Sequence, residues 1–568
     1  MILILLTFGW FYLTAVDYHS LSKNAISSLG FFSNLYYLSE SGYFDVSSHK
    51  KWLLHTWSLS VEWQFYLIYP ILLSIAFNYY SKKIVKTLIV TLCLISFIFC
   101  VYLTAIYPEG SFYIFPTRAW EMMVGGISFL FPLTLTLKRK KVFEVMGMVM
   151  ILFACFYISN DDLWPGYLTL FPVVGTYLII VSERHQSRIT GNLVMQYIGK
   201  YSYSIYLWHW PIVLVFVYWG LTTNQYLILG MLLSLIAGYL SYVFIESRSS
   251  FKINTLNIYN AVTYPPILIT VIICSICLVI YQYKGFPSRI DARVVVAANE
   301  TNNRSSLSQC KPKTENKITH CIIGNKDNIT GIVLGDSHAK ALSTSIAQSM
   351  NTNTKGLLII SSNACPFILK AKITAKEHCF DTNNTTLELI EKSYPEIPIY
   401  IINRTSFYIY GNTNPSRRKS DKNSPRIYFD SQYEAITDNI FIEFERNYIN
   451  SMCHLAQKNT VYVTTPVPEM LVNVPEFMSK RMLIQNDFSD YSTSLHEHLK
   501  RNTFALNVIK KTESSCNINI LNTEEYLCFD DRCKGSIGGR PIYFDGDHLS
   551  EFGNKLLTPM FEKVIDKY

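Results

Sequence analysis

The chain has 568 residues, of which 49% are hydrophobic, and carries a formal net charge of +8 at neutral pH. This length allows more than one domain. The positive charges are dispersed and form no basic tract with interleaved aromatic residues, which argues against nucleic acid as a partner. Residues 1–281 hold nearly all of the long apolar runs, whereas residues 282–568 hold none that could span a bilayer.

The first half predicts a membrane domain of nine helices. Each helix corresponds to an apolar run of roughly 16–23 residues, close to the length that an α-helix needs to cross the hydrocarbon core. The runs lie near residues 1–16, 63–80, 84–106, 117–137, 142–159, 167–182, 201–219, 226–246 and 259–281. We therefore expect residues 1–281 to form a polytopic α-helical membrane domain.

Charged loops orient these helices. Lys and Arg gather in the loops near 82–86, 138–141, 184–200 and 248–252, and are absent from those near 107–116, 160–166 and 220–225. The positive-inside rule makes the basic loops cytoplasmic. Nine spans from a cytoplasmic N-terminus place the second half on the far side, so we expect an inner-membrane protein with a periplasmic C-terminal domain.

The second half predicts an α/β domain with a mainly parallel sheet. Polar residues 282–328 suggest a linker, and β-branched apolar runs at 331–334, 357–361, 398–402 and 461–465 then alternate with helix-length segments. We take residues 329–568 as the domain. Sites in such sheets form at the carboxyl ends of strands.

Cysteine usage is consistent with an exported second half. Five of the 13 cysteines lie in predicted spans, and an even number, eight, follow residue 282, which suggests disulfide bonds. Zinc is the less favoured alternative, because no compact cluster with zinc-ligand spacing occurs, and we expect no metal. The sequence leaves the pairing open; proximity favours Cys310–Cys321, Cys365–Cys379 and Cys528–Cys533, with Cys453–Cys516 as the remainder.

The stretch "GIVLGDSHAKALS" (331–343) runs from a predicted strand into a predicted helix and presents Ser337 at the junction. A capped strand-to-helix turn is the simpler interpretation. A nucleophilic serine needs a base and a third group that orients the base. The stretch "YFDGDHLSEFGNKLL" (543–557) supplies both in Asp545 and His548. We therefore consider Ser337, His548 and Asp545 together as catalytic candidates.

The membrane half has ionisable residues near the predicted outer ends of its helices. "LLHTWSLSVEWQFYLIYP" (53–70) contains His55 and Glu62, and "PTRAWEMMVGG" (116–126) contains Arg118 and Glu121. Ionisable groups within spans are costly and usually serve function. The neighbouring tryptophans are more simply explained as an interfacial belt.

The stretches around Ser337 and His548 make the second half resemble the SGNH (GDSL-like) hydrolase and acetyltransferase superfamily. The resemblance is to the variant that is fused behind a membrane acyltransferase. The resemblance implies that Ser337 is the nucleophile, His548 the base and Asp545 its orienting carboxylate. It also implies a cysteine pair near the Ser337 stretch and another near the His548 stretch. Cys310/Cys321 and Cys528/Cys533 occupy these places in the sequence. The Ser337 N–H would stabilise the oxyanion, with Asn403 of "IINRTSF" as a further candidate donor.

The first half closely resembles the acyltransferase-3 family through "HTWSLSVE", "TRAWE" and "YSYSIYLWHWP". The combined architecture is similar to the O-antigen acetylase type. Family members with this fusion usually have about eleven spans, and this chain looks as though it lacks the first two. In family members, the first two spans carry the histidine that is regarded as essential in the membrane domain. We therefore assign the role of this histidine to no residue of this chain.

The resemblance implies an O-acetyltransferase that moves an acetyl group from cytoplasmic acetyl-CoA to a surface glycan, with lipopolysaccharide O-antigen first among acceptors and peptidoglycan behind it. Acetyl-CoA, the glycan and membrane lipid are the expected partners, with no bound cofactor. Two alternatives stay open, a membrane-anchored carbohydrate esterase and a non-catalytic truncated remnant.

Overall fold

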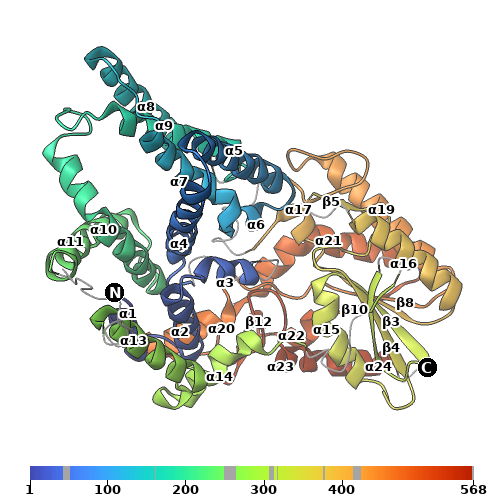
Figure 1. Cartoon of the computed structure of the whole chain (residues 1–568). Coiled ribbons are helices and arrows are strands. Elements are labelled where there is room, and N and C mark those ends of the chain that lie inside the picture. The colour runs from blue at the N-terminus through green and yellow to red at the C-terminus, as the bar shows by residue number, and fades with distance from the viewer. Residues whose placement is uncertain are drawn as a thin grey trace. The chain divides into compact units, whose positions relative to one another are not determined.

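The structure is a computed structural model that describes residues 1–41, 51–159, 162–248, 264–305, 313–315, 318–374, 378–413 and 424–565. The chain divides into two compact units, Met1–Phe286 and Pro287–Tyr568 (Figure 1).

The N-terminal unit is helical, as predicted. A helix lies in each of the nine apolar stretches: α1 (Ile2–Tyr12), α4 (Thr56–Tyr79), α5 (Lys82–Ile106), α7 (Phe115–Leu130), α8 (Leu137–Tyr157), α9 (Leu170–Ser182), α10 (Leu193–Tyr218), α11 (Asn224–Ser241) and α13 (Pro265–Gln282). Among the described residues, four helices have the length and hydropathy to cross a bilayer, namely Thr56–Tyr79, Lys82–Ile106, Asn224–Glu246 and Pro265–Gln282. The total of nine spans stays a prediction.

Short polar helices occur between the apolar ones, in segments that contain no long apolar run. These are α2 (Ala15–Leu29), α3 (Ser33–Glu40) and α6 (Pro108–Tyr113). Buried hydroxyl groups join α2 and α3 to α4: the Ser28 and Thr56 oxygens are 2.7 Å apart, as are those of Ser33 and Ser60. Small polar side chains therefore contribute to the packing of α2 and α3, and α2 also buries Leu21 and Ala25 in an apolar core.

The C-terminal unit is built on a seven-stranded sheet in the order β1-β2-β4-β3-β6-β8-β10. Its strands are β1 (Lys313–Glu315), β2 (Ile318–Gly324), β3 (Ile329–Gly335), β4 (Gly356–Ser361), β6 (Ile399–Ile402), β8 (Val461–Thr464) and β10 (Asn519–Leu521). The five strands from β4 to β10 are parallel, and β1 and β2 run antiparallel at one edge. This confirms the predicted α/β fold with a mainly parallel sheet.

Both faces of this sheet are buried, because successive residues of a strand point to opposite faces. On β3, Val333 enters one apolar core, whereas Ile332 and Leu334 enter the other. The Val333 face is covered by α14 (Ala292–Asn299), α15 (Ser337–Gln348), α20 (Val474–Gln485) and α24 (Thr558–Ile565). The opposite face is covered by α16 (Cys379–Ser393), α19 (Asp438–Ala456) and α21 (Leu495–Cys516) (Figure 1).

The structure differs from the expected linker at residues 282–328. Helix α14 packs into the domain core through Val294 and Ala297, and β2 pairs with β4. The polar character that suggested a linker arises because α14 buries only one side and β2 carries Thr319 and His320 in its first half.

Three disulfide bonds lie in the described part of the C-terminal unit: Cys365–Cys379, Cys453–Cys516 and Cys528–Cys533. The first connects the segment after β4 to α16, and the second connects α19 to α21. The third joins β11 (Cys528–Phe529) to β12 (Arg532–Lys534). Cys310, the proposed partner of Cys321, lies outside the described residues.

Candidate active site

Ser337 lies where β3 passes into α15, at the carboxyl edge of the parallel strands. It is the first residue of α15 and is largely buried. The close approach of β3 and β6 requires a glycine at position 335, at the end of β3. Gly335 has a φ of 145°, and a Cβ there would collide with the carbonyl oxygen of Ile402. The N–H groups at a helix start lack intrahelical partners, so Ser337 can offer its own N–H to a ligand.

The structure brings together the three residues that the sequence predicted as a catalytic set. Ser337 Oγ lies 2.7 Å from His548 Nε2, and His548 Nδ1 lies 2.9 Å from Asp545 Oδ2. The other Asp545 oxygen accepts the backbone N–H groups of Asp547 at 2.9 Å and His548 at 2.8 Å. The turn that carries Asp545 therefore fixes both the carboxylate and the imidazole.

Asp336 connects the segment that carries Ser337 to the loop after β6. Its Oδ1 accepts the His338 N–H at 2.9 Å and so caps α15. Its Oδ2 accepts the Arg404 N–H at 2.7 Å and the Tyr408 hydroxyl at 2.8 Å. Asp336 is consequently a structural anchor of the site.

Asn403, the candidate oxyanion donor, is buried at the end of β6. A Cβ on Gly335 would lie 2.9 Å from Asn403 Oδ1, which places the Asn403 side chain against the backbone two residues before Ser337. Asn403 Oδ1 accepts the Phe367 N–H at 3.1 Å, whereas its Nδ2 has no hydrogen-bond partner among the described residues. A buried amide without a partner costs free energy unless a ligand accepts its hydrogen bond.

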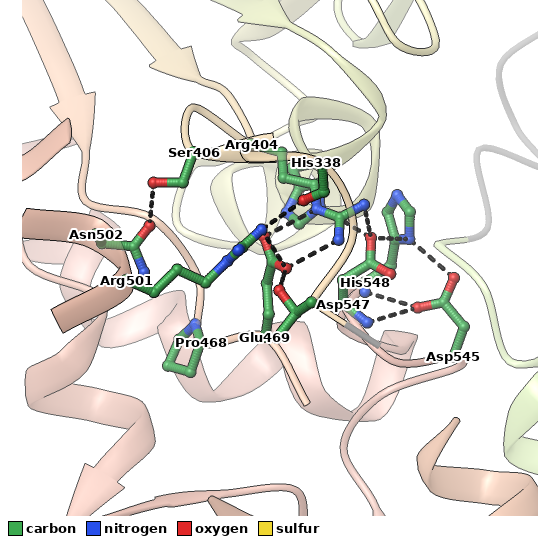
Figure 2. A network of polar contacts seen from close by, with 12 residues as sticks. His338, Arg404, Ser406, Pro468, Glu469, Arg501, Asn502, Asp545, Asp547 and His548 are labelled. Atoms are coloured by element: carbon green, nitrogen blue, oxygen red, sulfur yellow. Dashed lines mark hydrogen bonds and ion pairs between the residues drawn. The ribbon is translucent and has the colours of Figure 1, made fainter. Parts of the chain in front are cut away.

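A buried charge network extends from the imidazole of His548. Figure 2 shows the guanidinium of Arg404 between the carboxylates of Glu469 and Asp547. Arg404 donates to the two oxygens of Glu469 at 3.0 and 2.9 Å, and its Nη1 lies 2.9 Å from Asp547 Oδ2. The same Asp547 oxygen lies 3.2 Å from His548 Nδ1 and 3.5 Å from His338 Nε2.

These charges change the protonation of the site. Burial lowers the pKa of His548, but the negative charges of Asp545 and Asp547 outweigh it and raise this pKa to about 9. Burial raises the pKa of Glu469, but the positive charge of Arg404 outweighs it and lowers this pKa to about 2. The site therefore favours the imidazolium form of His548.

A metal site is the alternative interpretation of part of this network. Potential ligand atoms of His338, Asp547 and His548 lie within 4.8 Å of one another. However, the Asp547 oxygen is held by the Arg404 guanidinium, and His548 Nδ1 contacts Asp545. A cation there would face a fixed positive charge, so we assign these residues to the charge network.

In the N-terminal unit, the structure pairs Arg118 with Glu121 at 2.7 Å on α7. Both side chains line a cavity of about 270 Å³, together with Trp164 and Thr169. His55 is buried at the start of α4, and its ring centre lies 5.6 Å from that of His209. Glu62, further along α4, is half-buried.

Arg404 and Glu469 belong to the site, although the sequence did not predict them as site residues. Both follow carboxyl ends of parallel strands, Arg404 after β6 and Glu469 after β8. The rule that ligands bind at this edge of the sheet could have identified them. Nothing in the sequence showed that they bind each other, because they are 65 residues apart.

Comparison with known families gives a match for each of the two units. Residues 1–280 match the family described as "Acyltransferase domain", and residues 309–563 match that described as "SGNH domain (fused to AT3 domains)". The chain belongs to the acyltransferases that carry a fused SGNH domain. Its helical unit is the acyltransferase domain of a membrane protein, and the unit with Ser337 is the SGNH domain.

Relatives of this acyltransferase include envelope-modifying proteins. It is 29% identical over 217 residues to "Peptidoglycan O-acetyltransferase OatA" of Listeria monocytogenes, covering 34% of each chain. It is 28% identical over 255 residues to "O-acetyltransferase OatA" of Staphylococcus aureus, covering 40% of this chain and 41% of that one. The matches thus span less than half the length of these curated relatives.

Among solved structures, the periplasmic domain of a Salmonella ser. Paratyphi A lipopolysaccharide acetyltransferase matches with a TM-score of 0.31 and 16% identity. The match covers 43% of this chain and 84% of that domain.

Proposed function

We propose that this acyltransferase is an O-acetyltransferase and that the acetyl group passes through Ser337 to a hydroxyl of a cell-envelope glycan. The hydrogen-bonded series Ser337–His548–Asp545 is the observation that carries the proposal. A serine hydroxyl becomes a useful nucleophile only when an oriented base takes its proton. The family match and the O-acetyltransferase names of the relatives support acetyl transfer as the reaction.

The first half-reaction would acetylate the enzyme. Neutral His548 accepts the hydroxyl proton of Ser337 at Nε2 while Oγ attacks the acetyl carbonyl, and Asp545 accepts a hydrogen bond from the Nδ1–H and stabilises the imidazolium that forms. The tetrahedral intermediate carries its negative charge on the former carbonyl oxygen. The Ser337 N–H and the Nδ2 of Asn403 are the proposed donors to this oxygen. Collapse expels the donor's leaving group, which takes the proton from His548, and leaves an acetyl ester on Ser337.

The second half-reaction would use the same groups in the opposite sense. A glycan hydroxyl gives its proton to His548 and attacks the acetyl ester, which forms a second tetrahedral intermediate. When this collapses, the Ser337 oxygen leaves and recovers the proton from His548. Water in place of the glycan would give hydrolysis, so occupancy of the acceptor site decides between transferase and esterase activity.

For the membrane domain, we propose that it delivers acetyl groups from cytoplasmic acetyl-CoA to an SGNH domain in the periplasm. Acetyl-CoA is charged, so the acetyl group has to cross the inner membrane without it. Arg118 and Glu121, which line a cavity of the helical unit, are candidates for this step, as are His55 and Glu62.

As the acceptor, we propose lipopolysaccharide O-antigen, because the two-domain architecture resembles O-antigen acetylases. Peptidoglycan is the second candidate, favoured by the name of the Listeria monocytogenes relative.

Cells that lack their own envelope O-acetyltransferases can test these proposals. The full chain is expressed there, and base-released acetate is measured in purified lipopolysaccharide and in purified peptidoglycan. Ser337→Ala is compared with Ser514→Ala, which removes an exposed hydroxyl from α21. Ser337-dependent acetate in lipopolysaccharide supports the proposal, and Ser337-dependent acetate in peptidoglycan changes the acceptor. Equal acetylation by both variants would contradict the proposed role of Ser337.

A further inference from the structure

The catalytic imidazole contacts two carboxylates rather than one. His548 Nδ1 lies 2.9 Å from Asp545 Oδ2 and 3.2 Å from Asp547 Oδ2, yet the nitrogen carries a single hydrogen. We propose that Asp547 is a positioning residue for acyl transfer, whose negative charge lies beside His548 Nδ1 while Asp545 accepts the hydrogen bond from that nitrogen, and that Arg404 holds Asp547 there. This inference rests on the proposed function.

Arg404 is fixed at several points, so it can hold Asp547 in a defined place. Its Nε and Nη2 donate to the two Glu469 oxygens, which leaves Nη1 directed at Asp547 Oδ2 (Figure 2). Its backbone N–H donates to Asp336. Glu469 is held in turn by Arg501, at 3.5 Å. A planar guanidinium with two parallel bonds to one carboxylate has little freedom to rotate.

The balance of buried charge gives this arrangement a chemical consequence. Three carboxylates (Asp545, Asp547 and Glu469) face two guanidinium groups (Arg404 and Arg501). One negative charge is therefore uncompensated while His548 is neutral, and protonation of the imidazole compensates it. The imidazolium is the form that arises when His548 takes the serine proton, so the network stabilises the charge that develops during the reaction.

The other titratable groups at the site do not supply this compensation. Asp336 accepts hydrogen bonds from backbone N–H groups and from the Tyr408 hydroxyl. His338 approaches the shared Asp547 oxygen at 3.5 Å, and its ring centre lies 4.6 Å from that of His548. Its imidazole therefore touches the same carboxylate without separating it from His548.

Asp547 and Arg404 act on His548 in opposite directions, which permits a specific test. The negative charge of Asp547 raises the pKa of His548, whereas the positive charge of Arg404 lowers it. Replacement of each by a neutral residue should therefore move the pH midpoint of activity in opposite directions. A purely structural role would reduce activity without such opposite displacements.

The test uses the purified full chain in detergent, with para-nitrophenyl acetate as the acetyl donor, over about pH 6 to 10. The rate of Ser337→Ala is subtracted at each pH. Asp547→Asn should move the midpoint of kcat/KM to lower pH by about one unit or more, because a charge this close typically shifts a pKa by 1–3. Arg404→Gln should move it to higher pH.

Two controls accompany these variants. Arg404→Lys keeps the positive charge and should displace the midpoint less than Arg404→Gln. Asp531→Asn removes an exposed carboxylate from the β11–β12 turn and should leave the profile unchanged. If Arg404→Gln does not fold, Asp547→Asn decides the question alone, because it keeps the side-chain shape and one acceptor oxygen.

An Asp547→Asn midpoint equal to that of the unmodified chain would overturn the inference while the proposed function stands. Displacement of the pH midpoints of Asp547→Asn and Arg404→Gln in the same direction would also overturn the inference. Full esterase activity of Ser337→Ala would instead overturn the proposed function, and this inference with it.

Discussion

The raised pKa of His548 predicts that this enzyme is most active at alkaline pH. The base must be neutral to accept the proton of Ser337, and its pKa is raised to about 9. Below that pH, the fraction of His548 that is neutral falls about tenfold for each pH unit. Only about 1% of the molecules therefore have a neutral His548 at pH 7. We therefore expect kcat/KM to rise about tenfold from pH 7 to pH 8 and to level off above pH 9.

The assay measures release of para-nitrophenol from para-nitrophenyl acetate by the full chain in buffers of constant ionic strength. This ester hydrolyses spontaneously at high pH, so the rate with Ser337→Ala serves as the blank at each point. A fluorescence check of folding at every pH separates titration from unfolding. A profile that is level between pH 7 and pH 9, after subtraction of the blank, would show that Asp545 and Asp547 do not raise the pKa of His548 to about 9.

Three further predictions concern the same domain. Asp545→Asn should lower kcat by about 10³–10⁴-fold, because an amide that donates to Nδ1 stabilises the wrong imidazole tautomer; unchanged kcat would exclude Asp545 as the orienting group. Gly335→Ala should destabilise the SGNH domain by more than about 3 kcal/mol, since its Cβ collides with β6; denaturant unfolding measures this, and an unaltered midpoint refutes it. The raised pKa of His548 should stabilise the fold by up to about 3 kcal/mol below pH 6.5, an increment lost as the pH rises through 9; thermal unfolding against pH checks the sign, in comparison with His548→Asn.

Much of the SGNH fold could be predicted because its signals are local. The runs at 331–334 and 461–465 became β3 and β8, since strands buried on both faces read as continuous β-branched stretches. The site followed from topology: Ser337 comes after a parallel strand, and a base with an adjacent carboxylate occurs near the domain's end. The structure places Ser337 Oγ 2.7 Å from His548 Nε2, although the two residues are 211 positions apart in the sequence.

Other features could not be read from the chain because they depend on partners far away in sequence. Helix α3 lacks an apolar stripe and packs through hydroxyl contacts to α4, so its polar sequence resembled a loop. Arg404 and Glu469 looked like ordinary polar residues, and only their mutual contact shows that they belong to the site. Asp547 stood beside the base in the sequence, but its contact with His548 Nδ1 depends on the geometry of the turn.

We expect the acetyl group to reside on Ser337 during the reaction, and this covalent intermediate can be detected directly. Isotope-labelled para-nitrophenyl acetate is mixed with the full chain, the reaction is quenched in acid within a turnover, and peptides are mapped by mass spectrometry. We expect one labelled acetyl group on the peptide that contains Ser337, and its loss when an acceptor glycan is added before the quench. Continued turnover with no label on Ser337 would show that the acetyl group does not pass through this serine.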